Sequence, residues 1–464
     1  MSRPPCRKNQ SAVSTDTHVR RDIPQPPDAG VLNGLRFGTD PLRFLDAVQA
    51  RYPDAVEVPI PGRPPLVVVT NPDLVHDALG RPEAFGRISG DGLGLPADNG
   101  LVQSEGDLWR QQRSIMLPAF VGQQVVAYGD TAGQRSVVLG DRLGRAAADG
   151  RTVDLHREMT TLTIRVASEI LLGEDVGRER AATFHEWMQV ATDELAISPS
   201  GIAPDWLPLP NSTEYEAAAG EMQAMAEEVI DRRRATLADG GEPGADMLSL
   251  LLSAEDDPTV EYPPNQIRDE VLTFLIAGHE TTALSLTYTL SLLSAHPEVR
   301  QRVREEARSV LGDATPRYEH ADDLPYTTRV FREALRLYPA AWAVFREANA
   351  EVRLGDYRVK DGSAMIFPQY SIHRDGRYFA APETFDPDRW ERRDPDAVDA
   401  YFPFGSGPHA CIGRQFALTG ATLTTASLIR DLDVRVDEGA LDDLQATITL
   451  RPRDEVNATV ERAE

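Results

Sequence analysis

The sequence predicts a mainly α-helical protein with small β-sheets. Apolar residues recur at helical spacing through most of its 464 residues, and the longest such run covers residues 265–295. At about 1.5 Å per residue this run would span roughly 45 Å, enough to cross a whole domain. Strand-like segments are short, and the first two, residues 56–60 and 66–70, are separated by Pro61 and Gly62.

One folded domain is expected over residues 31–464, because no linker divides the chain and its length allows a large core. Residues 1–30 are polar and proline-rich, with few apolar side chains to offset the entropy of ordering, and predict a disordered tail. The tail lacks the apolar segment of a signal peptide, and no apolar run approaches the roughly 20 residues of a membrane span. The two cysteines, Cys6 and Cys411, lie far apart, which argues against a disulfide and favours a cytoplasmic location.

The chain is strongly acidic, with a formal net charge of −25. A general nucleic-acid binder needs a basic face that replaces counterions at phosphates, so we exclude nucleic acid as a partner. Lys8 and Lys360 are the only lysines, and arginine supplies nearly all the positive charge. Two explanations stay open: a G+C-rich coding sequence, or selection for a hydrated acidic surface in a salty cytoplasm.

The other elements follow in order along the chain. Ser104 and Asp107 have the spacing of a capping pattern before a helix that ends near Pro118. Residues 85–100 are glycine-rich and irregular, which at this length is typical of a functional loop. Helices are expected over residues 40–52, 73–79, 123–173, 178–197, 215–237, 325–338 and 412–432, and strands over residues 352–366 and 447–450.

Residues 198–211 combine prolines with the apolar Ile202, Trp206, Leu207 and Leu209. One interpretation is a loop whose apolar residues fold back on neighbouring helices. The other is a lid over a substrate channel, able to collect a hydrophobic substrate or touch a membrane surface.

The stretch from residue 402 to residue 414, Phe-Pro-Phe-Gly-Ser-Gly-Pro-His-Ala-Cys-Ile-Gly-Arg, carries the strongest chemical signal. Its glycines permit close approach of the backbone to a flat ligand, and Phe402 and Phe404 can shield a sulfur from water. A helical pattern begins at Ile412, so Cys411 would lie at a helix N-terminus, where free N–H groups stabilise a thiolate. The alternative is a buried, inert cysteine in a glycine-rich turn.

Written as F-x-x-G-x-[RH]-x-C-x-G, this stretch resembles the haem-binding signature of the cytochrome P450 family. The resemblance implies a P450 fold, with haem b between the long helix and the helix after the cysteine, and with O2 as co-substrate. It makes Cys411 the axial metal ligand, whose thiolate favours cleavage of the O–O bond. Matching residues of the stretch are Phe404, Gly407, His409, Cys411 and Gly413.

A second motif lies in the middle of the long helix, at residues 277–282. Thr281 is placed to bond back to the carbonyl of Ala277, and Gly278 removes bulk nearby, which together would open a groove for dioxygen. Glycine and paired threonines cost helix stability, so the site needs a compensating reason. The segment resembles the family's A-G-x-[DE]-T-[TS] oxygen-activation motif, which implies that Glu280 and Thr281 are the catalytic acid–alcohol pair.

Further segments match the family in its usual order. The Trp109 and Arg113 pair resembles a W-x-x-x-R motif that contacts haem propionates, and Arg346 is expected to reach one as well. Glu333 and Arg336 form an E-x-x-R pair that, with Arg389, would lock a helix to the loop before the cysteine. The residues implied to bind the cofactor are Trp109, Arg113, Ala277, Arg346, Phe404, Gly405, His409 and Gly413.

These matches imply a monooxygenase of the soluble prokaryotic type, which inserts one oxygen atom into a small hydrophobic substrate, with fatty acids or isoprenoids weakly preferred. The chain ends soon after the haem domain, so a ferredoxin or flavodoxin with its reductase is expected to supply electrons. A basic docking patch of Arg110, Arg392, Arg393 and Arg414 is a further hypothesis. The rivals are a peroxygenase, isomerase or dehydratase that needs no donated electrons, and a non-catalytic haem protein that senses gas or carries electrons.

Overall fold

The computed structural model describes residues 21–27, 30–59, 64–88, 96–194 and 213–463. The loop predicted over residues 198–211 lies outside these ranges, as do residues 1–20 of the predicted tail. The predicted start of the folded domain near residue 31 is too late. Strand β1 (Arg21–Asp22) pairs in parallel with strand β8 (Tyr357–Val359), and Ile23 is buried in the core beside them. Pairing with a distant strand, which the local composition does not reveal, orders this segment.

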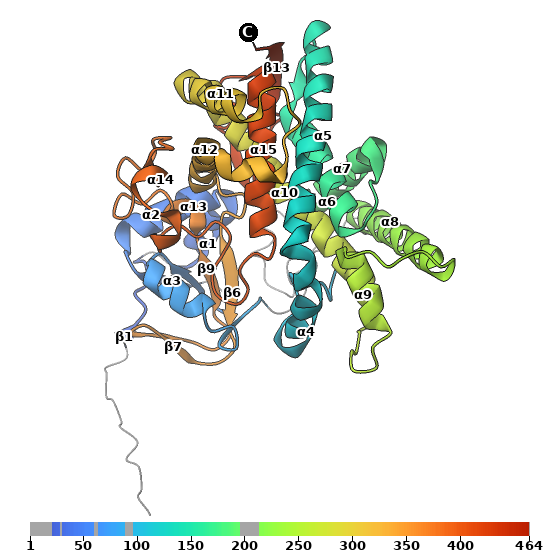
Figure 1. Ribbon diagram of the computed structural model, residues 1–464. Coiled ribbons are helices and arrows are strands. Elements are labelled where there is room, and N and C mark those ends of the chain that lie inside the picture. Colours follow the sequence, from blue (N-terminus) through green and yellow to red (C-terminus); the bar gives the residue numbers. More distant parts are fainter. Residues whose placement is uncertain (1–20, 28–29, 60–63, 89–95, 195–212, 464) are drawn as a thin grey trace, which may run out of the picture.

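The predicted predominance of helices is confirmed (Figure 1). The first half of the described chain forms α1 (Gly30–Thr39), α2 (Pro41–Arg51), α3 (Pro72–Leu79), α4 (Gly106–Met116), α5 (Gln123–Ala148), α6 (Leu155–Leu171), α7 (Gly177–Glu194) and α8 (Thr213–Ala238). The second half forms α9 (Met247–Glu255), α10 (Gln266–Ala295), α11 (Pro297–Leu311), α12 (Pro325–Leu337), α13 (Gln369–Ile372), α14 (Arg389–Arg392) and α15 (Arg414–Asp431). Short 3₁₀ turns are η1 (Leu117–Phe120), η3 (Tyr318–Asp323) and η4 (Pro395–Ala397).

Local capping explains several helix starts. Asp40 accepts a hydrogen bond from the backbone N–H of Arg43 at the start of α2, and Pro41 occupies its first turn. The helical pattern predicted over residues 123–173 forms two helices, α5 and α6. Gly150, with a φ of 65°, follows the end of α5 and stops the helix from continuing. Asp154 then caps α6 by accepting a hydrogen bond from the N–H of Arg157. The predicted cap at Ser104 is wrong, because the Ser104 hydroxyl donates to Gln112 and α4 begins at Gly106.

Within the described ranges, the strands form four small sheets. The largest contains β2 (Ala55–Val58), β3 (Leu66–Val69), β9 (Ala364–Phe367), β6 (Val344–Ala348) and β4 (Phe85–Gly86), in that order. A second sheet has the order β1-β8-β7, with β7 at Val352–Leu354. A third has the order β10 (Leu432–Val436), β13 (Asn457–Arg462) and β5 (Val153–Asp154). The fourth pairs β11 (Leu444–Ala446) with β12 (Leu450–Pro452). The predicted strand at residues 447–450 is therefore mainly the turn between β11 and β12.

The helical core is built around α10, which is buried along most of its length. It packs against α6, α8, α12 and α15, while α15 also lies along α5. In Figure 1 the large sheet, with β6 and β9 labelled, lies on the side of the molecule that holds α1 to α3. No helix in the described ranges combines the length and the apolar character that crossing a lipid bilayer would require.

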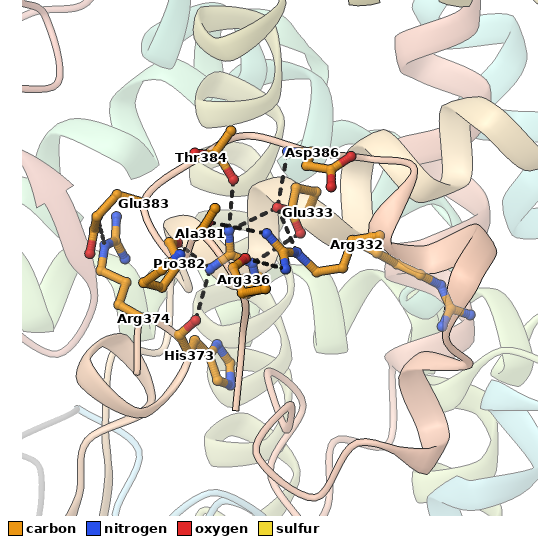
Figure 2. A network of polar contacts seen from close by, with 12 residues as sticks. Arg332, Glu333, Arg336, His373, Arg374, Ala381, Pro382, Glu383, Thr384 and Asp386 are labelled. Carbon is orange, nitrogen blue, oxygen red and sulfur yellow. Dashed lines mark hydrogen bonds and ion pairs between the residues drawn. The ribbon is translucent and has the colours of Figure 1, made fainter. Parts of the chain in front are cut away.

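A buried polar network joins α12 to the loop that leads toward Cys411 (Figure 2). The Glu333 and Arg336 side chains are both fully buried, and their closest nitrogen and oxygen lie 2.8 Å apart. Arg389 donates to Glu333 as well, at 3.3 Å, so the predicted structural trio is confirmed. The remaining donors of Arg336 reach backbone carbonyls of His373, Pro382 and Thr384, at 2.9, 2.6 and 3.1 Å. All five guanidinium N–H groups are thereby used.

Residues 97–104 are held against α10 by acidic side chains. Glu270 accepts from the backbone N–H of Leu101 and from Gln266, both at 3.0 Å, and Asp269 accepts from the N–H of Asn99 at 3.1 Å. Gly100 approaches so closely that a Cβ there would lie 1.8 Å from the Thr273 hydroxyl oxygen. Burial raises the pKa of Glu270 to about 8; the Leu101 N–H opposes this in part, and the charge of Asp269 adds to it.

Glu270→Gln is expected to flatten the dependence of stability on pH. The folded protein binds a proton at Glu270 that the unfolded chain releases near its ordinary pKa of 4.5, so stability falls as pH rises from about 4.5 to about 8. The slope from this group is at most ~1.4 kcal/mol per pH unit. Urea unfolding across this window should show a shallower slope for Glu270→Gln, whereas the exposed Glu242→Gln should retain the parent slope. An unchanged slope in Glu270→Gln would contradict the raised pKa of Glu270 in the folded protein.

Candidate active site

A cavity of about 840 Å³ lies between α10, the Cys411 loop, β6 and the β11–β12 turn. Its wall is largely apolar, with Val102, Ala343, Val344 and Ile448 among the lining residues. A few hydroxyl and amide groups also face it, from Gln103, Thr281, Thr282, Ser285 and Thr447. Such a wall suits a hydrophobic ligand that a small number of polar contacts orient.

The Cys411 loop is shaped by glycine. Gly405 and Gly407 both have a φ of 70°, a backbone conformation that side chains disfavour. A Cβ at Gly407 would also lie 2.1 Å from the carbonyl oxygen of Leu79 on α3, so only glycine fits there. The Cys411 N–H donates to the carbonyl of Phe404 at 2.9 Å, which closes the loop. Cys411 opens onto the cavity, three positions before α15 begins at Arg414.

The helix N-terminus does not by itself make the thiol of Cys411 anionic. Desolvation by the surrounding protein raises its pKa, and the N–H of Gly413 and the charges of Arg113 and Arg414 offset that effect only in part. The position beside the start of a helix is as predicted, and the N–H of Gly413 lowers the pKa of the thiol as expected there, although desolvation outweighs this effect. A metal ion would reverse the balance, since a coordinating thiol loses its proton.

Three arginines and a histidine converge at one end of the cavity. Arg87, Arg113, Arg346 and His409 all line it, and Trp109 packs against His409 with ring centroids 4.2 Å apart. Burial and the three arginine charges lower the pKa of His409 to about 3, and burial with the charge of Arg346 lowers the pKa of Arg87 to about 10. Nδ1 of His409 is buried without a hydrogen-bond partner in the described part of the chain. The cluster would therefore be stabilised by an anionic ligand, and the propionates of haem fit it.

Arg87 is the cluster residue that sequence reasoning missed. It follows β4, whose Gly86 pairs with Glu347 of β6, and this pairing brings Arg87 near Arg346. Its side chain donates to the carbonyls of Ser104 and Leu101, at 3.0 and 3.1 Å. The available signal was an arginine at the edge of the irregular segment 85–100, but nothing local links it to a motif 322 positions later.

Arg87→Leu is expected to weaken retention of haem by roughly tenfold to hundredfold, the range for loss of a charged hydrogen bond. Transfer of haem to excess apomyoglobin measures this directly. Arg110→Leu serves as the matched control, because Arg110 is exposed and does not line the cavity. Equal transfer rates for Arg87→Leu and the parent protein would show that Arg87 does not help to hold the haem.

The motif of α10 places its threonine and its acid on different faces. Ala277, Gly278 and Thr281 line the cavity, and the Thr281 hydroxyl donates to the Ala277 carbonyl at 2.8 Å, as predicted. A Cβ at Gly278 would meet only Ala167, at an ordinary 4.0 Å, so helix packing does not require this glycine. Its absent side chain leaves room on the cavity side.

Glu280 is not among the described residues that line the cavity. Consecutive helix residues point about 100° apart, so Glu280 does not point in the same direction as Thr281. Its side chain faces the β11–β12 turn instead. There its Oε1 accepts from the Thr449 hydroxyl at 3.1 Å. Burial raises the pKa of Glu280, and the charge of Arg451 and the Thr449 bond lower it less. The acid and the alcohol are thus neighbours in sequence that do not share the cavity.

The hypothesised docking arginines each have a partner. Arg110 pairs with Asp107, Arg414 with Asp396 and Arg392 with Asp386, while Arg393 donates to the Tyr378 carbonyl. Exposed pairs of this kind contribute little stability, and they reduce the net positive charge that the hypothesis requires.

Comparisons with known proteins agree with this arrangement. Residues 24–456 match the family model "Cytochrome P450". Among the relatives, cyclooctatin synthase of Streptomyces melanosporofaciens is 32% identical over 92% of this chain and 91% of its own. Cyclooctat-9-en-7-ol 5-monooxygenase of the same organism is 34% identical over 84% of each chain, and pentalenene oxygenase of Streptomyces avermitilis is 30% identical over 86% of this chain and 88% of its own. The chain therefore belongs to the cytochrome P450 family, whose members bind haem and use O2, and is a monooxygenase.

Proposed function

We propose that this monooxygenase inserts one atom of O2 into a cyclic terpenoid, with electrons delivered by a separate ferredoxin or flavodoxin. The observation that carries the proposal is that Cys411 and Thr281 open onto the same large apolar cavity. The names of three relatives, which mention cyclooctatin, cyclooctat-9-en-7-ol and pentalenene, support the substrate class. The few polar groups on the wall suit a substrate with at most one or two hydroxyl groups.

The residues present fit haem b. Cys411 would hold the iron, and Arg87, Arg113, Arg346 and His409 would face the propionates, with Trp109 supporting His409. Ala277, Phe404, Gly405 and Gly413 would lie against the macrocycle. Bound haem supplies the iron at which O2 is reduced, and a thiolate ligand favours cleavage of the O–O bond.

The protein's own part is to bind the substrate, exclude water and deliver protons. The apolar wall holds the substrate, and the Thr281 hydroxyl, on the cavity side of α10, positions water that passes a proton inward. Glu280 is the acid that resupplies this proton. Its raised pKa keeps a larger share of the carboxyl group protonated than in an ordinary glutamate.

Titration of the haem-loaded protein with pentalenene, cyclooctat-9-en-7-ol and palmitic acid tests the substrate class. The terpenoids are expected to shift the iron spin state at lower concentrations than palmitic acid, and to yield products labelled from ¹⁸O2 only when a ferredoxin and its reductase are present. A response to palmitic acid alone would favour a fatty-acid hydroxylase. Products formed from peroxide without electron donors would favour a peroxygenase, and no spectral response to any organic compound would favour an electron carrier or sensor.

A further inference from the structure

The β11–β12 turn, residues 447–449, touches both the cavity and the acid of α10. Thr447 and Ile448 line the cavity, and Thr449, the next residue, donates its hydroxyl hydrogen to Glu280. The Thr449 and Glu280 side chains are both buried, so water does not compete for this bond. One short turn therefore joins the substrate space to Glu280.

Hydrogen bonds make the turn a single unit. The Thr447 hydroxyl donates to the Thr449 carbonyl at 2.9 Å, across Ile448, and Trp342 donates to the Thr447 carbonyl at 2.8 Å. After the turn, the N–H of Leu450 donates to the Ala340 carbonyl at 2.8 Å. Since Thr447 and Thr449 are bonded to each other, a displacement of Ile448 moves Thr449 as well.

The surroundings of Glu280 favour its present orientation. The Arg451 guanidinium of β12 acts on it from the same side as Thr449, while Tyr288 lies on the same helix and donates to the Leu450 carbonyl at 2.6 Å. His156, at the start of α6, faces Arg451 in turn. To reach water near Thr281, the Glu280 side chain must leave Thr449.

We propose that Thr449 is a positioning residue that holds Glu280 on the β11–β12 turn, and that a substrate pressing on Ile448 releases the acid toward Thr281. This rests on the proposed function, because it takes the cavity as the substrate site. No covalent bond changes in the release; the hydrogen bond from Thr449 is exchanged for one on the cavity side. Proton supply then depends on whether the cavity is filled, which limits wasteful reduction of O2 in the absence of substrate.

Infrared pH titration of the haem-loaded protein tests the first half of the proposal, with the Glu280 carboxyl band identified by its loss in Glu280→Gln. Thr449→Val removes the donor at nearly constant volume and is expected to raise the pKa of Glu280, because the lost bond favours the carboxylate. Thr449→Ser should restore the parent titration. Thr287→Val is the matched control, since Thr287 is equally buried on α10 and bonds to Ala283 instead. A parent-like titration in Thr449→Val would overturn the proposal.

Ile448→Ala tests the link to the cavity. Trimming this side chain loosens the turn from its cavity side, and the Glu280 titration is expected to shift toward that of Thr449→Val. Val344→Ala removes comparable bulk from another part of the wall and should leave the titration unchanged. An unchanged titration in Ile448→Ala, or an equal shift in both variants, would refute the coupling. Because the readout is ionisation of Glu280 and no substrate is converted, failure here is separate from failure of the terpenoid assignment.

Discussion

Cys411→Ser is expected to abolish the thiolate signature in the spectrum of the reduced, CO-bound protein, and with it monooxygenase activity. A serine hydroxyl has nearly the same size as the thiol, so the loop can retain its shape. Its oxygen is a harder and weaker donor than a thiolate, so the electron-donating ligand of the iron is lost. The Cys411 backbone bond to Phe404 does not depend on the side chain. Absorption spectra of the reduced protein with CO are the direct measurement.

The chain provides its own control in Cys6, the only other cysteine. Cys6→Ser should give the parent spectrum and activity, which separates loss of a specific ligand from loss of any thiol. Circular dichroism of Cys411→Ser should show an intact helical fold, because the thiol side chain makes no hydrogen bond that a serine hydroxyl cannot make. A normal CO spectrum from a folded Cys411→Ser would mean that another group holds the iron.

Arg336→Met is expected to destabilise the protein by about 3–5 kcal/mol, the range for removing one partner of a buried ion pair. The change removes one of the two arginines that bond the buried carboxylate of Glu333, and it leaves three backbone carbonyls without their donors. Arg336→Lys should also destabilise it, because an ammonium group carries three donors and the site uses five. Urea unfolding of the haem-loaded protein, followed by circular dichroism, gives the free energies.

The Asp107 and Arg110 pair is the matched control, with the same spacing of three residues on a helix but with both side chains largely exposed. Arg110→Met should change the free energy of unfolding by less than about 1 kcal/mol. If Arg336→Met does not fold, the proportion of soluble, haem-bound protein can still be compared between Arg336→Lys and Arg110→Met. A lower proportion for Arg336→Lys is then expected. Equal stability of Arg336→Lys and the parent would show that the five-donor geometry is not needed.

Pairs close in sequence were predicted well. The Thr281 bond to Ala277 and the Glu333 pair with Arg336 both follow from helix geometry, which sets neighbours at three and four residues. The long helix was predicted within one residue of α10 at each end, because its apolar pattern is long. Boundaries that involve distant partners were not: β1 pairs with β8, and the break between α5 and α6 contains β5, which pairs with β13.

By itself, the sequence determined the family, the helical class and the identity of the motif residues, since these depend on residue type at short, fixed spacing. Only the tertiary structure decided which of them share a space. It brought Arg87 beside Arg346 and His409, turned Glu280 away from the cavity toward Thr449, and surrounded Cys411 with enough protein to raise the pKa of its thiol. The physical reason is that burial and long-range contact depend on how distant segments pack, and local spacing does not determine that packing.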